Sequence, residues 1–298
     1  MTLKSLLRRV IAALGIPLLL GSVPAEARTP KIAHPALWEV TDPDTTIYLF
    51  GTIHLLPDDL QWRTPKLDDA MASSQELVVE TIVDEKNPTK LMSAMASLGL
   101  AKGLPPIMAR VPAAQRPALA AAIKKSGVPE MAYNGMKTWM AAFLLLGDQF
   151  KALGLSGGAE KVLKTSFTGE GKTIGELETN VEQLSFFDRL PESAQLALLE
   201  GAIEDQKATN TEFSGMLDAW ARGDVKGIAQ TFDRELSDSP ALQQELIEQR
   251  NANWSKWIEQ RMAEPGTIMI AVGAGHLAGH YSVLELLKRD GYRVRRLQ

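Results

Sequence analysis

Two of the four histidines in the chain occur in the same local setting, which is an apolar segment followed by Gly-x-x-His. The first motif runs from Gly51 to His54 and the second from Gly273 to His276. Glycine lets the backbone turn sharply and keeps a side chain out of the approach to a ligand. A single histidine after a strand is usually a hydrogen-bonded structural residue. The repetition of the motif therefore favours a functional site built from both.

Two glutamates also follow apolar segments. Glu80 comes directly after the segment LVV, and Glu178 closes the segment TIGELE. In open α/β sheets, ligands bind at the carboxyl ends of the strands. If the four strands are parallel neighbours, His54, Glu80, Glu178 and His276 gather on one rim of the sheet. A solvated strand end is the alternative explanation for each glutamate taken alone.

The segments that carry these residues lie near both ends of the chain. We expect strands over residues 36–40, 45–50, 76–81, 172–177, 267–272 and 292–297, a mostly helical region between 88 and 264, and a helix over 277–289. This pattern predicts an α/β fold with α+β character, in which the N- and C-terminal segments form a mixed sheet around a large helical insertion. We expect a single domain over residues 28–298, with a helical subdomain at about 88–262.

The first residues are typical of a secretory signal peptide. Lys4, Arg8 and Arg9 precede an apolar run over residues 10–20, and the small-x-small sequence AEA ends at Ala27. The run is shorter than the ~20 apolar residues that a membrane span needs. We therefore predict cleavage after Ala27 and a protein that is exported, either to the periplasm or out of the cell.

The composition excludes several functional classes. The chain has no cysteine, which excludes disulfides and thiol nucleophiles, and its formal net charge of -4 argues against a nucleic-acid partner. No later apolar segment is long enough for a stable membrane span. We expect a peptide or small-molecule substrate, and the oligomeric state stays open.

Several motifs resemble those of the TraB/GumN family, which includes the Tiki-type metalloproteases. The matching segments are LFGTIHLLP at 49–57, LVVET at 77–81, LETNVEQL at 177–184, Arg250-Asn251-x-x-Trp254 and VGAGHLAGHYSVLELLKRDGYRV at 272–294. The resemblance covers Trp38 to Leu297 and is most specific at the two ends. Family members often carry Gly-Leu/Val-Asp in the helical middle, where this chain has Gly-Gly-Ala-Glu over residues 157–160.

The resemblance implies a site built from the two Gly-x-x-His motifs, an acid and an arginine, which are here Gly51, His54, Glu80, Arg250, Gly273 and His276. Tiki-type members are metal-dependent peptide hydrolases. More distant relatives include erythromycin esterase-like hydrolases, in which a histidine acts as base, and ChaN-like haem-binding proteins. The guanidinium of Arg250 suits a carboxylate or a developing oxyanion. A surface ion pair with the nearby Glu245 or Glu248 is the alternative.

The available ligand types suit a divalent metal. Imidazole and carboxylate, without thiolate, fit Mn, Co, Zn or Fe. His54, Glu80 and His276 as ligands would leave coordination positions open for water and substrate. Such a metal would lower the pKa of its bound water, and Glu178 would serve as a general base or orient a ligand.

We therefore expect an exported metal-dependent hydrolase, with peptidase as one candidate activity. Glu80, Glu178 and Arg250 are the candidate catalytic residues, and Gly51 and Gly273 the candidate cofactor-binding residues. The alternative is a non-catalytic protein that binds a metal, haem or small ligand, or an accessory factor of surface-polymer or conjugation systems. His280 is an auxiliary candidate, because it lies four residues after His276 on the expected helix.

Overall fold

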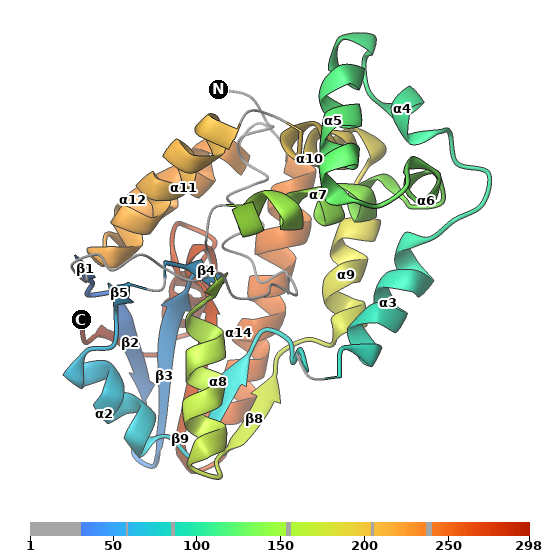
Figure 1. The fold of residues 1–298 in the computed structure, drawn as a ribbon. Helices are drawn as coiled ribbons and strands as arrows, with labels where there is room; N and C mark the ends of the chain where they lie inside the picture. The colour runs from blue at the N-terminus through green and yellow to red at the C-terminus, as the bar shows by residue number, and fades with distance from the viewer. Residues whose placement is uncertain (1–30, 58, 85–86, 153–155, 204–205, 237–239) are drawn as a thin grey trace.

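A computed structural model describes residues 31–57, 59–84, 87–152, 156–203, 206–236 and 240–298 (Figure 1). The expected signal peptide at residues 1–27 lies outside these ranges, so its cleavage stays a prediction. The division into one domain with a helical subdomain also stays a prediction.

A six-stranded mixed sheet forms the centre of the fold, as expected. Its strand order is β10-β2-β3-β9-β6-β8, and β3, β9, β6 and β8 are parallel to one another. The strands are β2 (Leu37–Thr41), β3 (Thr45–Thr52), β6 (Glu76–Val79), β8 (Thr173–Glu176), β9 (Gly266–Gly273) and β10 (Val294–Arg296). The sheet therefore joins strands from both ends of the chain, and β2 and β10 complete it with antiparallel pairs.

The two central strands bring the Gly-x-x-His motifs to the same level. In β3 and β9 the carboxyl-terminal halves are buried on both faces, which explains their nearly continuous apolar sequences. Their register places Gly51 opposite Val272 and Thr52 opposite Gly273. Each motif therefore leaves the sheet at the same edge, beside the other.

Helices cover both faces of the sheet. On one face lie α2 (Pro65–Ser73) and α8 (Ala159–Gly169), and on the other α14 (Gln249–Met262) (Figure 1). Buried side chains of α15 (Val283–Arg289) belong to the same core cluster as those of α14. The N-cap of α2 is Thr64, whose hydroxyl accepts a hydrogen bond from the backbone N–H of Leu67. Trp254 and Ile258 of α14 pack with Ile270 of β9 in the core of the second face.

The remaining helices lie mainly beyond the carboxyl edge of the parallel strands (Figure 1). They are α3 (Thr89–Gly99), α4 (Ile107–Arg110), α5 (Arg116–Ser126), α6 (Glu130–Asn134), α7 (Thr138–Ala152), α9 (Asn180–Asp188), α10 (Glu192–Gly201), α11 (Gln206–Ala221), α12 (Val225–Leu236) and α13 (Pro240–Gln243). A π-helical segment, Gln244–Glu248, joins α13 to α14. Within the described ranges, no helix has the length and apolar character needed to cross a membrane.

The expected helix over residues 277–289 was wrong in its first half. A short 3-10 turn spans Ala274–Leu277, and α15 begins only at Val283, with Ser282 as its N-cap. Gly279, at a φ of 84°, turns the chain between the two segments. His280 is consequently not on a helix with His276. It is exposed and lies beside Arg289.

Candidate functional site

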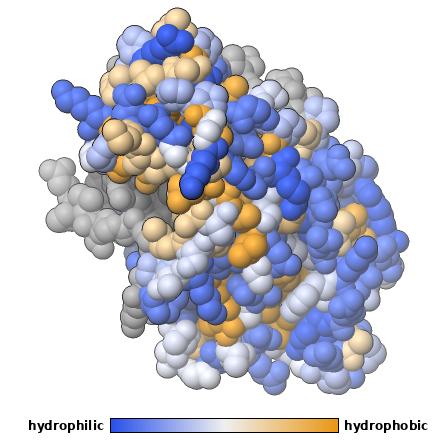
Figure 2. All heavy atoms as spheres, turned by 90° about the vertical axis from the view of Figure 1, so that its right-hand side faces the viewer, coloured by the Kyte–Doolittle hydropathy of each residue, from blue (hydrophilic) through white to orange (hydrophobic). Residues whose placement is uncertain are grey.

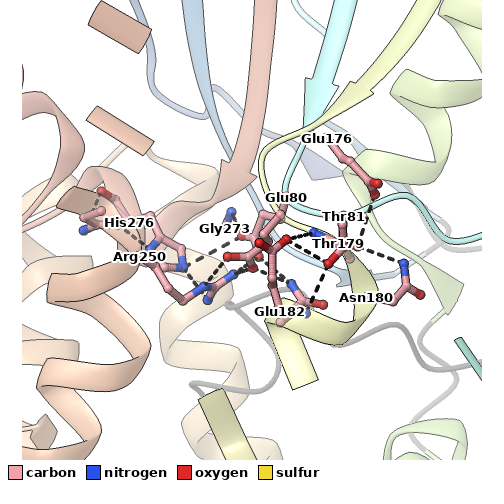
Figure 3. Close-up of polar contacts among 12 residues, drawn as sticks. Glu80, Thr81, Glu176, Thr179, Asn180, Glu182, Arg250, Gly273 and His276 are labelled. Atoms are coloured by element: carbon pink, nitrogen blue, oxygen red, sulfur yellow. Dashed lines mark hydrogen bonds and ion pairs between the residues drawn. The ribbon is translucent and has the colours of Figure 1, made fainter. Parts of the chain in front are cut away.

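Four parallel strands deliver the candidate residues to one edge of the sheet. His54 follows β3, His276 follows β9, Glu80 follows β6 and Glu178 follows β8. Arg250 reaches the same place from α14 (Figure 3). The structure thus brings together five ionisable residues that the sequence singled out, and only the auxiliary candidate His280 lies elsewhere among the described candidates.

Arg250 is the centre of this group and is only 1% exposed. Its Nη2 donates a 2.7 Å hydrogen bond to Glu80 Oε2 and a further one to Glu178 Oε1. Its Nε donates to Glu178 Oε2 at 3.1 Å. The guanidinium also lies over the Trp254 ring, 4.7 Å from its centroid. Arg250 is therefore held by a buried pair of carboxylates, not by Glu245 or Glu248 of the π-helical segment that precedes α14.

The hydrogen bonds of His276 define its tautomer. Its Nε2 lies 3.1 Å from Arg250 Nη1, and a guanidinium can only donate, so Nε2 accepts. Nδ1 then carries the proton and donates to Asn251 Oδ1 at 2.6 Å. Burial, together with the charges of Arg250 and His54, holds the pKa of His276 well below its usual value. His276 is therefore neutral, and its lone pair faces Arg250.

The two carboxylates share further donors. Glu80 Oε1 accepts a 2.7 Å hydrogen bond from the backbone N–H of Gly273 (Figure 3). Gln183 Nε2 lies 3.2 Å from Glu80 Oε2 and 3.1 Å from Glu178 Oε1. Burial raises the pKa of Glu178 despite its contact with Arg250. One guanidinium faces two buried carboxylates here, which leaves an excess of negative charge when both are ionised.

His54 lies nearer the solvent, with 16% of its side chain exposed, and pairs with Glu160. Its Nδ1 is 3.0 Å from Glu160 Oε1, whereas its buried Nε2 has no hydrogen-bond partner. Burial lowers the pKa of His54, but the carboxylates of Glu160 and, less strongly, Glu80 outweigh it, so the net pKa is raised. The Thr52 hydroxyl donates to Glu160, and the pKa of Glu160 is lowered in spite of its burial.

Close backbone packing positions Glu160. The backbone N–H of Ala159, at the start of α8, donates to the Ile53 carbonyl at 3.1 Å. A Cβ atom on Gly158 would lie 2.1 Å from that carbonyl oxygen and 2.4 Å from the Cα of His54. Glycine is therefore required for α8 to begin directly against the backbone of the first Gly-x-x-His motif.

The two glycines expected to bind a cofactor have structural contacts in the described residues. A Cβ on Gly51 would come within 3.1 Å of the Ala274 Cα, so glycine allows the two motifs to pack together. Gly273 contributes its backbone N–H to Glu80. Their role toward a bound group stays a prediction.

Three residues of this site did not emerge from the sequence as candidates, namely Glu160, Gln183 and Asn251. Each lies in a segment that can be compared with a motif of the TraB/GumN family. Glu160 ends the Gly-Gly-Ala-Glu segment over residues 157–160, Gln183 belongs to the LETNVEQL segment, and Asn251 follows Arg250 in the helical motif. Position in a family motif, more than residue type, could have identified them.

The three expected metal ligands differ in their availability. His54 Nε2 has no hydrogen-bond partner, and the carboxylate of Glu80 retains acceptor capacity. His276 Nε2 already accepts a hydrogen bond from Arg250. Across the described ranges, no group of three or more histidines or acids is arranged to hold a metal ion. Coordination by all three would therefore require Arg250 to release His276.

Comparison with known proteins agrees with the motifs. A sequence profile described as the TraB/PrgY/gumN family matches residues 36–296. The chain is 24% identical over 243 residues to a protein described as uncharacterized protein YbaP of Escherichia coli (strain K12), which covers 81% of this chain and 87% of that protein. The YbaP protein of Shigella flexneri matches equally. No solved structure shows a significant match.

Proposed function

Because the chain belongs to the TraB/PrgY/gumN family, and because its ionisable residues meet at the carboxyl edge of the sheet, we propose that it is a metal-dependent hydrolase. Peptides are the first substrate class to test. The observation that carries this proposal is the buried Nε2 of His54, which has no hydrogen-bond partner. An imidazole nitrogen without a hydrogen-bond partner can bind a metal or accept a proton from water.

In this proposal, Glu160 fixes the tautomer of neutral His54. A carboxylate on Nδ1 holds the proton at that nitrogen and leaves the lone pair of neutral His54 on Nε2. Thr52 keeps the carboxylate in place through its hydroxyl. Because the pKa of His54 is raised, its Nε2 becomes available as the pH rises above the usual histidine value of about 6.5.

The buried charges support a cation beside His54. Glu80 and Glu178 together outweigh the single charge of Arg250, and a nearby cation would stabilise both carboxylates. His54 and Glu80 are the donors ready to hold a divalent metal, and His276 would join them once Arg250 releases it. The bound metal would supply a water molecule of lowered pKa.

The proposal also includes export of the protein. The sequence of the first 27 residues supports a signal peptide that is removed after Ala27. Mass spectrometry of the protein from the periplasmic or secreted fraction tests this directly. A mature chain that still begins at Met1 would contradict export by this route.

The central experiment combines metal analysis with a hydrolysis assay. The purified protein is loaded with Mn, Co, Zn or Fe, its bound metal is measured by mass spectrometry, and cleavage of a peptide library is followed with and without a chelator. We expect His54→Ala to lose both bound metal and cleavage. The matched control is His280→Ala, which removes an exposed imidazole and should retain both.

Each outcome has a defined meaning. Cleavage that survives chelation would refute metal dependence while leaving His54 as a base, and cleavage that survives His54→Ala would refute the whole proposal. A metal that binds stoichiometrically without any turnover would indicate a binding protein. A haem absorption band that His54→Ala removes would indicate the same for haem.

A further inference from the structure

Residues 87–137, which contain α3, α4, α5 and α6 and which we call the basic lobe, differ in charge from the rest of the protein. The lobe carries a net charge of +6, with Glu130 as its only acidic residue, whereas the whole chain has a net charge of -4. Lys137 pairs with Asp188, and Arg110 donates to backbone carbonyls. The exposed cations are Lys90, Lys102, Arg116, Lys124 and Lys125.

Large apolar side chains are exposed on the same lobe. Met131 is 82% exposed, and Met92 and Leu100 are 53% and 48% exposed. Figure 2 views the molecule from the side on which the lobe projects and shows apolar and charged side chains interspersed there. Such side chains gain free energy when they leave water, so three of them on one basic lobe favour a contact site.

Tertiary contacts hold these apolar and basic groups on adjoining segments. Leu100 forms an isolated β-bridge with Met136, which joins the end of α3 to the residues after α6. The Tyr133 hydroxyl donates to Ser126 Oγ at 2.8 Å and fastens α6 to the end of α5. The segments that carry Leu100 and Met131 therefore adjoin those that carry Lys102, Lys124 and Lys125.

We propose that the basic lobe docks on an anionic lipid bilayer. Lysine and arginine are attracted to anionic headgroups, and exposed leucine and methionine side chains gain by entering the interface. A polyanion in solution would satisfy the cations but would leave Leu100 and Met131 in water. The rest of the chain carries a net charge of -10, so repulsion would keep it away from the same surface.

This docking would orient the candidate site relative to the membrane. Helix α3 of the lobe packs against α9, and α9 begins two residues after Glu178. The lobe therefore lies next to the buried group of Arg250, Glu80 and Glu178. Docking does not depend on catalysis, so it is separate from the proposed hydrolase activity.

Vesicle flotation tests the proposal on the full-length mature protein. The vesicles contain either phosphatidylcholine alone or equal parts of phosphatidylcholine and phosphatidylglycerol. The lobe variant is K102Q/K124Q/K125Q, and the matched control R222Q/K226Q/K256Q removes the same charge from exposed positions elsewhere. Each basic residue near an anionic surface contributes about fivefold to binding. We therefore expect about a hundredfold loss for the lobe variant and little change for the control.

Further measurements separate this proposal from its rivals. Binding to the mixed vesicles should weaken in high salt, and L100S/M131S should weaken it without changing the charge. Circular dichroism checks that each variant is folded. Failure of the wild-type protein to float with mixed vesicles, including the case in which it binds soluble polyphosphate, would overturn the proposal. An equal loss in the lobe variant and the control would also overturn it.

Discussion

Gly158 is where the amino end of α8 meets the backbone of the first Gly-x-x-His motif, so Gly158→Ala tests how the site is positioned. The new Cβ would lie 2.1 Å from the Ile53 carbonyl oxygen, whereas real Cβ contacts are longer than 3.0 Å. The start of α8 must therefore move by roughly 1 Å, because the obstacle is backbone. Glu160 lies two residues further along and would be carried away from His54.

The expected cost follows from the contacts that this movement breaks. Overpacking of a closely fitted site costs about 1–3 kcal/mol. The hydrogen bond from Ala159 to Ile53, now 3.1 Å long, would be lengthened or lost at a cost of about 1 kcal/mol. We therefore expect Gly158→Ala to reduce the free energy of unfolding by about 2–4 kcal/mol, and the raised pKa of His54 to fall as Glu160 withdraws.

Urea denaturation and an NMR titration of the imidazole of His54 measure the two effects. Gly169→Ala is the matched control, because Gly169 ends the same helix and a Cβ there would meet nothing within 4 Å. The control should lose no stability and gain up to about 1 kcal/mol from helix propensity. A Gly158→Ala variant with wild-type stability and a wild-type His54 titration would refute the reasoning.

The remaining predictions concern charge. Glu160→Gln keeps an acceptor for His54 Nδ1 but removes the negative charge that raises the pKa of His54, so this pKa should fall in an NMR titration of the metal-free protein; an unchanged titration would contradict the pairing. Because the pKa of His54 is raised, its pairing stabilises the fold fully below about pH 6.5; because the pKa of Glu160 is lowered, its pairing stabilises the fold fully above about pH 4.5. The stability lost in Glu160→Gln should therefore be largest between these two pH values and should decrease on either side of them. Arg250→Met leaves Glu80 and Glu178 buried without their cation and should cost about 3–5 kcal/mol at neutral pH. This cost should decrease at pH 5, because burial raises the pKa of Glu178 and lets it take up a proton. An equal cost at both pH values in urea denaturation would show that the charge is not its cause.

The meeting of His54, Glu80, Glu178 and His276 could be predicted from the sequence. Each residue follows an apolar segment, and parallel neighbouring strands end at one edge of a sheet. That inference needed only the strand direction and order, which the α/β pattern suggests.

The partners within the site could not be predicted in the same way. Arg250 has Glu245 and Glu248 close in sequence, but its actual carboxylate partners, Glu80 and Glu178, follow β6 and β8. Which face of α14 turns inward depends on packing against the sheet. Likewise, the contact between His54 and Glu160 depends on how closely the backbone at Gly158 packs against that of Ile53 and His54. Packing between segments so far apart in the sequence leaves no periodic pattern of residues from which it could be predicted.

The position of β9 has a consequence for the order of folding. This strand lies between β3 and β6, yet it comes from Gly266–Gly273, near the end of the chain. Until β9 has been synthesised, β3 and β6 have no common neighbour, and Glu80 lacks its Gly273 donor. Closing loops of this length carries a large entropic cost, which slows folding. A nascent or truncated chain would therefore expose two unpaired strand edges to aggregation, and the site could assemble only in a finished polypeptide.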